Sequence, residues 1–262
     1  MSTAGSRDPR PTTFRHREEV MGTIVTLDFF DDRGISSDEL RPFLDNAVAT
    51  LHHADKVFST WKPDSPISRL RRGDITLGEA PVEVTEVLDR CKVAREMTRG
   101  WFDPWSLPGG VDPTGYVKGW AAQRAIDELA GSEVEGVMVN AAGDIASFGG
   151  PDSASPFRVG ILNPASPKTL ACALDLRGAI ATSGTYERGE HLINPFTGEL
   201  ATKLASASVT GPDLGLSDAL ATALVVGGDE VLELIDELND YEALAIGYDG
   251  TMKWTSEFPL SP

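Results

Sequence analysis

The last third of the chain carries side chains of the types needed for chemistry on a phosphate group. Asp218 and Thr222 stand four residues apart in the apolar run Ser-Asp-Ala-Leu-Ala-Thr-Ala-Leu, residues 217–224. On a helix this spacing places both side chains on one face, and a carboxylate and a hydroxyl are hard oxygen ligands suited to Mg²⁺. His191 precedes a turn containing Asn194 and Pro195, where an imidazole that titrates near neutral pH could act as a general base.

Each of these signals also has an ordinary structural interpretation. An Asp and a Thr four residues apart are commonly a helix N-cap and a threonine bonded back to its own helix. A lone histidine is commonly structural or solvated. The apolar neighbours of Asp218 predict a buried helix, however, and a buried carboxylate needs a partner. The pattern therefore favours a metal-binding role for Asp218 and Thr222.

Polar residues in the middle of the chain extend this candidate site. Asp144 follows Gly143 after the predicted buried strand 136–140, so the end of that strand could cradle a ligand, with an ordinary Asx turn as the alternative. Asp112 and Lys118 bracket Gly115. A backbone carbonyl near Gly115 could reach a metal while Asp112 and Lys118 meet a cofactor. The alternative is a plain loop before a helix.

Aromatic side chains are concentrated in the stretches predicted as loops. They are Trp61, Trp101, Phe102 and Trp105. Aromatic rings in loops either stack on a flat ligand ring or fill the core, and the residues alone leave both possibilities open.

The hydrophobic pattern predicts elements that must position these residues. Period-2 and β-branched runs predict strands, and apolar stripes at helical spacing predict helices. The strands are expected at residues 23–29, 136–140, 158–162, 169–176, 179–183, 192–193, 205–210, 243–247 and 252–255. The helices are expected at 36–57, 67–70, 85–98, 118–129, 217–226 and 230–238, with a long loop at 101–117. This mixture, without an internal linker or repeat, predicts the α+β class, with residues 1–13 as a disordered tail and residues 14–262 as one domain.

Composition limits the classes of function. The chain has 262 residues and a formal net charge of −17, which argues against non-specific binding of nucleic acid. Cys91 and Cys172 have no metal-like or redox-like spacing. The Gly-x-Gly-x-x-Gly and P-loop patterns are absent. No signal-like apolar segment and no run of about 18 apolar residues is present, so we expect no membrane span and a cytoplasmic protein.

Eight short blocks occur in one order along the chain and together resemble the FAD:protein FMN transferases, the ApbE family. They are Met21-Gly-Thr, Ser59-Thr-Trp-Lys-Pro-Asp-Ser-Pro-Ile-Ser68, Gly100-Trp-Phe-Asp-Pro104, Asp112 through Lys118-Gly119, Asn140-Ala-Ala-Gly-Asp-Ile145, Ala181-Thr-Ser-Gly-Thr-Tyr-Glu-Arg188, His191-Leu-Ile-Asn-Pro-Phe-Thr-Gly198 and Asp218-Ala-Leu-Ala-Thr-Ala-Leu224. The resemblance covers residues 21–224. The chain departs from the family pattern at Ala142, at Trp101 and at 70–72, where Leu-Arg-Arg replaces a usual Asn.

The resemblance implies a single compact ApbE-like domain, related to the T-fold, with mixed sheets and flanking helices. The implied activity is Mg²⁺-dependent transfer of the FMN half of FAD to a threonine or serine hydroxyl of a target flavoprotein, with release of AMP. The resemblance assigns Mg²⁺ to Gly115, Asp218 and Thr222, and His191 is the expected base. The implied FAD contacts are Met21, Trp61, Trp101, Phe102, Asp103, Asp112, Lys118 and Ile193, with Asp144 as a further pocket residue.

Two other functions remain open from the sequence. If water replaced the acceptor hydroxyl, the same residues would form a Mg²⁺-dependent FAD pyrophosphatase that yields FMN and AMP. A flavin-binding protein without turnover is the alternative from another class, although the Asp218–Thr222 pair and His191 argue against it.

Overall fold

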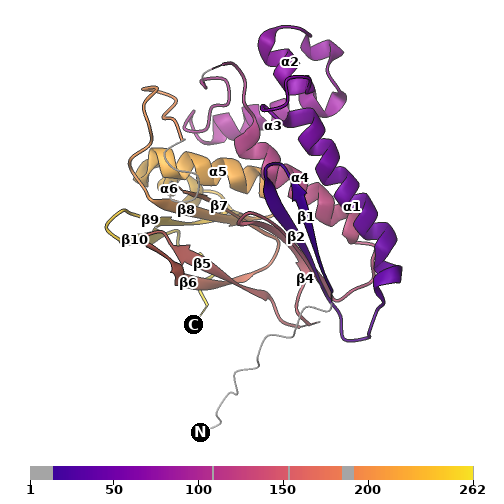
Figure 1. Cartoon of the computed structure of the whole chain (residues 1–262). Coiled ribbons are helices and arrows are strands. Elements are labelled where there is room, and N and C mark those ends of the chain that lie inside the picture. The colour runs from indigo at the N-terminus through magenta and orange to yellow at the C-terminus, as the bar shows by residue number, and fades with distance from the viewer. Residues whose placement is uncertain (1–13, 108, 153, 185–191, 262) are drawn as a thin grey trace.

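The protein consists of one large antiparallel sheet with helices on one face and a separate strand pair on the other (Figure 1). The structure is a computed structural model, and it describes residues 14–107, 109–152, 154–184 and 192–261. The predicted tail 1–13 and the predicted base His191 lie outside these residues. The α+β class expected from the sequence is confirmed.

The large sheet has eight strands in the order β1-β2-β3-β4-β7-β8-β9-β10, and every neighbouring pair is antiparallel. The strands are β1 (Phe14–Val20), β2 (Thr23–Phe30), β3 (Gly136–Ala141), β4 (Asp144–Gly149), β7 (Ala179–Gly184), β8 (Ser206–Gly211), β9 (Glu242–Ile246) and β10 (Met252–Trp254). Side chains alternate between the two faces of a strand, and β2, β3, β4, β7 and β9 carry apolar residues on both faces. In β3, for example, Val137 and Val139 belong to the core under the helices, whereas Met138 packs against the core on the other face.

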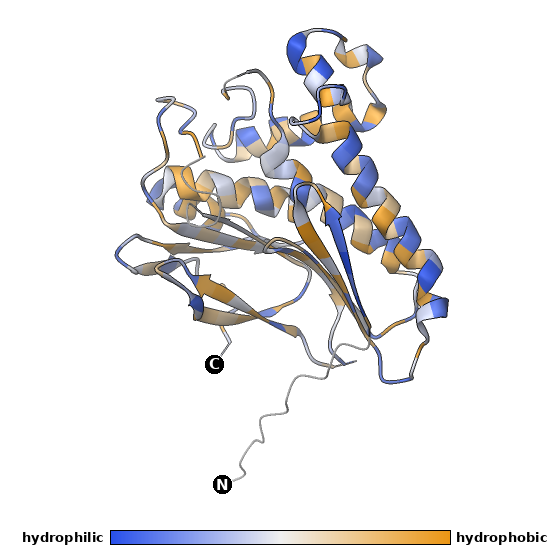
Figure 2. Ribbon diagram, in the orientation of Figure 1, coloured by the Kyte–Doolittle hydropathy of each residue, from blue (hydrophilic) through white to orange (hydrophobic). Residues whose placement is uncertain are grey.

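Three long helices cover one face of this sheet, namely α1 (Ser37–Phe58), α4 (Thr114–Leu129) and α5 (Leu214–Gly227). Helix α1 is amphipathic, and its buried stripe packs on α4 while its polar face is exposed (Figure 2). Helix α5 is different, because nearly all of its residues are buried. The remaining helices are α2 (Pro66–Arg72), η1 (Leu77–Glu79), α3 (Val82–Met97) and α6 (Asp229–Asp236).

The opposite face of the sheet is covered in part by the hairpin of β5 (Phe157–Asn163) and β6 (Ser166–Leu176). A second apolar core fills part of the space between them, and it includes Ile145, Ile161 and Ile180. The C-terminal segment runs along the outer edge of β6, where Leu174 and Leu260 form a bridge and Ser261 N donates to Ala173 O.

Glycines allow α4 and α5 to approach closely. A Cβ atom on Gly119 would lie 2.4 Å from the Leu214 carbonyl oxygen, and one on Gly215 would lie 2.8 Å from the Tyr116 ring. Gly115 and Gly119 are four residues apart, so both stand on the α4 face that meets α5. The helices therefore touch through their backbones.

The structure corrects three expectations about the elements. Helix α4 begins at Thr114 rather than Lys118, so Gly115 and Lys118 lie in its first turns and not in the loop. Residues 192–193 form only an isolated bridge, between Ile193 and Leu200, and not a strand of a sheet. Strands β1 and β4 were missed, β1 because most of its residues are charged and β4 because the sequence pattern marked only the turn before it. None of the helices among the described residues is long and apolar enough to cross a membrane.

Candidate active site

The candidate site lies at one end of the large sheet, under α4 and α5. The turn Met21–Gly22 joins β1 to β2, and the turn Ala142–Gly143 joins β3 to β4. Because Val25 pairs with Ala141 and Ile145 pairs with Ile180, both turns lie beside the last residues of β7. Side chains that the sequence separates by up to 200 residues thus meet at one edge, as the antiparallel order of the strands requires.

Asp218 and Thr222 face this edge from the middle of α5. Asp218 is only 3% exposed, and its Oδ2 accepts a hydrogen bond from Gly119 N at 3.3 Å. The Thr222 hydroxyl pairs with the Ser183 hydroxyl of β7 at 3.1 Å. The N-cap of α5 is Asp213, which accepts from Leu216 N. The capping interpretation of Asp218 is therefore wrong, and its carboxylate is buried for another reason.

The backbone of Gly115 lies directly beside Thr222. A Cβ atom at Gly115 would be 3.5 Å from Thr222 Oγ1 and 3.3 Å from the Phe102 ring. In a regular helix the Gly119 N–H would bond to the Gly115 carbonyl, but the same N–H also donates to Asp218. Asp218 thus competes for the donor that would normally satisfy the Gly115 carbonyl.

A buried ion pair stands next to Asp218. Lys118 Nζ lies 2.6 Å from Oδ2 of Asp144, whose side chain is fully buried. The other Asp144 oxygen accepts a hydrogen bond from Thr182 N at 3.1 Å. Burial, and then the neighbouring charge of Asp144, raise the pKa of Asp218 well above its usual value, while Lys118 and the Gly119 N–H oppose the rise. Once Asp218 loses its proton, two carboxylates face one ammonium, and a bound cation would neutralise the excess negative charge.

The donors available here fit a hard divalent ion. Asp218 supplies a carboxylate, Thr222 a hydroxyl and Gly115 a backbone carbonyl, all of them oxygen. Mg²⁺ prefers such ligands and usually binds through one or two protein carboxylates plus substrate phosphates. No group of three or more His, Cys, Asp or Glu side chains with metal-binding geometry occurs among the described residues, so an ion here would depend on hydroxyl, carbonyl and ligand oxygens.

The predicted aromatic contacts divide into buried and exposed rings. Phe102 is buried behind Gly115 and fills the core. Trp101 is partly buried, with Lys203 Nζ 4.4 Å from its ring centroid and Phe196 in edge contact at 4.8 Å. Trp61 is 93% exposed. Of these three, Trp61 has the ring most accessible for stacking.

Two predicted acidic contacts are held by arginines. Asp103 pairs with Arg95 Nε at 2.7 Å and accepts from Trp105 N. Asp112 lies 3.1 Å from Arg71 Nη1, and its other oxygen accepts from Thr114 N at the start of α4. The arginine at 71 stands in the segment that departs from the family pattern. It ties α2 to the loop before α4, because its Nε also donates to the Gly109 carbonyl.

The remaining predicted contacts lie in turns. Met21 has a positive φ of 54° in the β1–β2 turn and packs on the main core. Ile193 is half-buried and pairs with Leu200. His191 lies outside the described residues, so its role as a base stays a prediction.

Sequence reasoning missed three residues of this cluster. Ser183 was inside a quoted block without a role, although it supports the Thr222 hydroxyl. Gly119 could have been found from its spacing to Gly115. Arg71 gave no sequence signal, since its partner Asp112 is 41 residues away.

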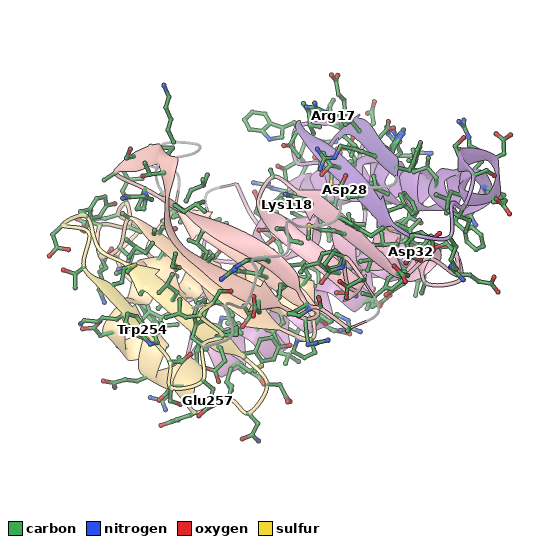
Figure 3. The ribbon with its side chains drawn as sticks, turned by 90° about the horizontal axis from the view of Figure 1, so that it is seen from below. Arg17, Asp28, Asp32, Lys118, Trp254 and Glu257 are labelled. Carbon is green, nitrogen blue, oxygen red and sulfur yellow. The ribbon has the colours of Figure 1, made fainter. Side chains whose placement is uncertain are left out.

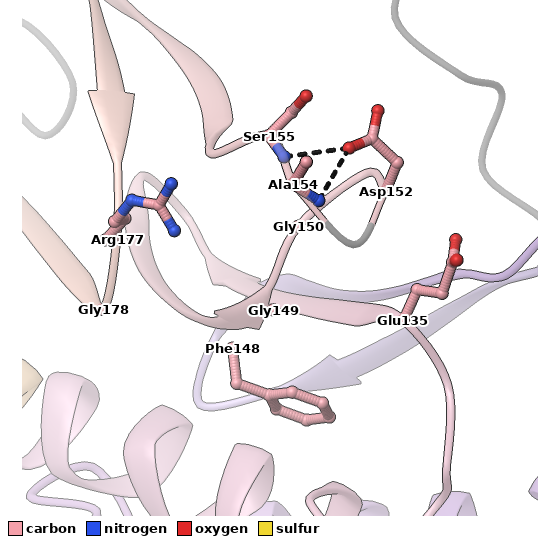
Figure 4. A pocket seen from close by; sticks show the side chains of 9 residues that line it. All are labelled: Glu135, Phe148, Gly149, Gly150, Asp152, Ala154, Ser155, Arg177 and Gly178. Atoms are coloured by element: carbon pink, nitrogen blue, oxygen red, sulfur yellow. Dashed lines mark hydrogen bonds between the residues drawn. The ribbon is translucent and has the colours of Figure 1, made fainter.

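Two hollows lie away from this cluster. A cavity of about 200 Å³ at the other end of β4 is lined by Glu135, Asp152 and Arg177 among others, and Asp152 there accepts from the Ala154 and Ser155 N–H groups (Figure 4). A groove of about 450 Å³ lies on the sheet face opposite α4 and α5. None of the predicted catalytic, metal or FAD-contact residues lines either hollow.

A sequence model of the ApbE family matches residues 21–109 and 106–245, which together include the whole cluster. The chain belongs to the ApbE family. It is 31% identical over 147 residues to the FAD:protein FMN transferase of Vibrio cholerae, covering 52% of this chain and 44% of that protein. It is also 35% identical over 130 residues to a Rhodobacter capsulatus protein of the same description, covering 46% of this chain and 24% of that protein. The aligned parts therefore span less than half the length of either relative.

Solved structures of ApbE proteins have the same fold. The flavin transferase ApbE of V. cholerae matches with a TM-score of 0.79 at 20% identity, over 95% of this chain and 99% of that chain. The ApbE protein of Thermotoga maritima matches with a TM-score of 0.80 at 20% identity, over 93% and 97%. The ApbE-like domain expected from the sequence is therefore confirmed.

Proposed function

We propose that this ApbE protein transfers the FMN moiety of FAD to a threonine or serine hydroxyl of a target flavoprotein. The acceptor oxygen forms a bond to the phosphorus of the FMN half, the diphosphate P–O bond to the AMP half breaks, and AMP leaves. The hydroxyl proton passes to a base. The observation that carries the proposal is the convergence of Asp218, Thr222 and Gly115 beside Lys118, in a family member whose curated relatives are described by this activity.

We propose Mg²⁺ as the metal, held by the carboxylate of Asp218, the hydroxyl of Thr222 and the carbonyl of Gly115. When bound, the ion neutralises charge on the diphosphate and on the departing AMP. The fit rests on the all-oxygen donor set and on the two buried carboxylates, Asp144 and Asp218, which face one ammonium.

The residues of the chain prepare this site for a diphosphate. Asp144 anchors Lys118 at the base of α4, so the ammonium is available next to the donors without having to be ordered on binding. Ser183 orients the Thr222 hydroxyl. Phe102 fills the space behind Gly115 and keeps water from that side of the backbone. Trp61 is the ring we assign to the flavin or adenine plane, because it is exposed.

His191 is the proposed base for the acceptor hydroxyl. An imidazole titrates close to physiological pH, which suits removal of the hydroxyl proton during attack. Residues 192–201 after it are bridged by Ile193 and Leu200, and Phe196 in this segment packs on Trp101. The contact holds Phe196 beside Trp101, which is one of the proposed FAD contacts. The cytoplasmic location also remains a proposal.

The test measures the mass of an acceptor. The protein is incubated with FAD, Mg²⁺ and a flavin-free recombinant flavoprotein domain that carries a threonine known to accept FMN in a phosphoester, and the products are analysed by intact mass spectrometry and by AMP release. We expect the acceptor to gain one FMN. Asp218→Ala and His191→Ala should abolish the gain, whereas Asp229→Ala, an exposed control on α6 paired with Lys253, should not.

Two results would replace the proposal. Release of AMP and FMN without a mass gain would identify the FAD pyrophosphatase, in which water takes the place of the acceptor. FAD that binds and stays intact in the presence of Mg²⁺ would identify a flavin-binding protein without turnover.

A further inference from the structure

The groove on the sheet face opposite α4 and α5 has the features of a binding site that the FMN transfer chemistry does not use. Its volume of about 450 Å³ is within the usual range for ligand sites. The lining comes from two surfaces, the large sheet and the hairpin β5–β6. The lining residues are Arg17, Ile24, Thr26, Asn140, Ala142, Gly143, Ile145, Val159, Gly160, Ile161, Leu162, Ile180 and Thr182.

One wall of the groove is the edge of a strand. Four consecutive residues of β5, from Val159 to Leu162, line it. Side chains of a regular strand alternate between faces, and the β5–β6 register shifts between Ile161 and Asn163, so four residues in a row bring the groove to the backbone of β5 as well as to one of its faces. Within the described part of the chain, β5 pairs with β6 alone, while the far edge of β6 is already covered by the C-terminal segment. An edge of this kind can accept a further extended strand.

The charge of the groove is opposite to that of the protein. The chain carries a formal charge of −17, with 40 acidic residues, yet the groove lining contains Arg17 and no Asp or Glu. Arg17 stands on the β1–β2 hairpin, as the view from below shows (Figure 3). The rest of the lining is mainly apolar, and Ile24 and Leu162 are 42% and 38% exposed. The lining therefore matches an extended segment with apolar residues and at least one carboxylate.

We propose that this groove binds an extended, acidic-apolar segment of the acceptor protein, which pairs with the free edge of β5. The proposal rests on the transferase function above and adds where the partner docks. The turn Ala142–Gly143 lines the groove, and the next residue, Asp144, belongs to the candidate active site on the other face. In β7, Thr182 lines the groove while its neighbour Ser183 reaches Thr222.

The distance between the two faces fits a short connection. Packed layers lie about 10 Å apart, and an extended chain advances about 3.3 Å per residue. A segment that leaves the groove at Ala142–Gly143 needs only about three to five residues to bring a hydroxyl around the end of the sheet. A docked strand would thus hold the acceptor threonine near Asp218 without occupying the FAD site.

The N-terminal segment of the chain itself is a poorer match. Residues 1–13 contain Arg7, Arg10 and one aspartate, Asp8, and their only hydrophobic residues are Met1 and Ala4. Such a segment would bring positive charge to Arg17 and little apolar surface to Ile24 and Leu162. A partner with carboxylates is favoured on both counts.

The first experiment is hydrogen exchange of the full-length protein loaded with FAD in EDTA, with and without the acceptor domain used above. We expect the amides of residues 157–163 to be protected by the acceptor and not by FAD alone. Protection by FAD alone would show that the groove is part of the FAD site and would overturn the proposal, as would transfer to the acceptor without protection of β5.

The second experiment uses kinetics. Leu162→Asp and Arg17→Glu place negative charge in the groove, and we expect each to raise the KM for the acceptor domain about tenfold, with the KM for FAD unchanged. Leu170→Asp is the matched control, since Leu170 pairs with Leu162 across the hairpin, is 58% exposed and does not line the groove. Equal acceptor KM values for Leu162→Asp, Arg17→Glu and wild type would overturn the proposal.

The two proposals fail in different ways. Protection of β5 by the acceptor domain without any gain of FMN would leave the docking groove standing and refute the transferase function. A gain of FMN by the acceptor with neither protection of β5 nor a change in the acceptor KM would support the transferase function and refute the docking groove. Absence of both binding and transfer would overturn both.

Discussion

The close backbone contact between α4 and α5 makes Gly119 the most informative position to change. Gly119→Ala would put a Cβ 2.4 Å from the Leu214 carbonyl oxygen and 2.8 Å from its carbon. Ordinary carbon–oxygen contacts begin near 3.4 Å, so α4 and α5 must separate by about 1 Å. Both atoms belong to backbone, and no flexible side chain can move instead.

The expected magnitude combines two opposing terms. Replacing a helical Gly by Ala gains about 1 kcal/mol of helix propensity. Overpacking costs about 1–3 kcal/mol, and the upper value applies because the clash is with backbone. The net loss is therefore about 2 kcal/mol, or roughly 4–8 °C in melting temperature for a chain of this length. The same displacement of about 1 Å would move Gly115 away from Thr222, and displacements of this size can cost about 100-fold in rate.

Thermal unfolding with Mg²⁺ and with EDTA, together with AMP release at 25 °C, would measure both effects. Gly78→Ala is the control, because a Cβ there meets nothing within 4 Å, and it should leave stability and activity near wild type. A Gly119→Ala protein that is more stable than wild type by the propensity term, with normal activity, would refute the close-packed arrangement of α4 and α5.

Three further predictions concern single side chains. Ala142 has φ of 52° in the β3–β4 turn. Ala142→Gly should therefore raise the free energy of unfolding by about 0.5–1 kcal/mol, because the relief of left-handed strain exceeds the cost of the added chain entropy. A lower free energy of unfolding in a denaturant titration would contradict this. Because burial and Asp144 raise the pKa of Asp218 in the folded state, the folded protein holds a proton that the unfolded chain loses above about pH 4. The contribution of Asp218 to stability should therefore fall as pH rises. In EDTA, the melting temperature of Asp218→Asn should rise relative to that of wild type between pH 5 and 8. Mg²⁺ should raise the melting temperature of wild type only. Melting temperatures that change in parallel with pH in the two proteins would contradict this. Lys118→Met leaves Asp144 buried and unpaired and should cost about 3 kcal/mol, most of which the double variant with Asp144→Asn should restore, as chemical denaturation would show.

The sequence predicted the elements best where the apolar pattern was long and regular. Helix α1 and the pair β5–β6 begin and end within about three residues of the expected ranges. Short or mixed patterns failed. Residues 192–193 are β-prone, but Ile193 forms only an isolated bridge with Leu200 of the same segment. The start of α4 was misplaced because Pro113, Thr114 and Gly115 are typical of a loop, whereas in the structure Asp112 receives the Thr114 N–H and starts the helix.

Some features of the candidate site were predictable from the sequence and others were not. The types and order of Gly115, Asp218 and Thr222 are a property of the sequence, and so is membership of the ApbE family, which depends on eight blocks in order. The sequence could not show that Asp144 is the buried partner of Lys118, or that Arg95 and Arg71 hold Asp103 and Asp112.

What the sequence determined by itself is therefore local: which segments have one apolar face, and which side chains could donate oxygen to a metal or take up a proton. Only the tertiary structure decided which of them meet. The antiparallel order of the strands brings the ends of β3, β4 and β7 to one edge, and the glycines of α4 and α5 let Gly115 lie against Thr222. The groove along β5 depends on the same order, because pairing and burial are set by contacts between residues far apart in the chain, which no local pattern encodes.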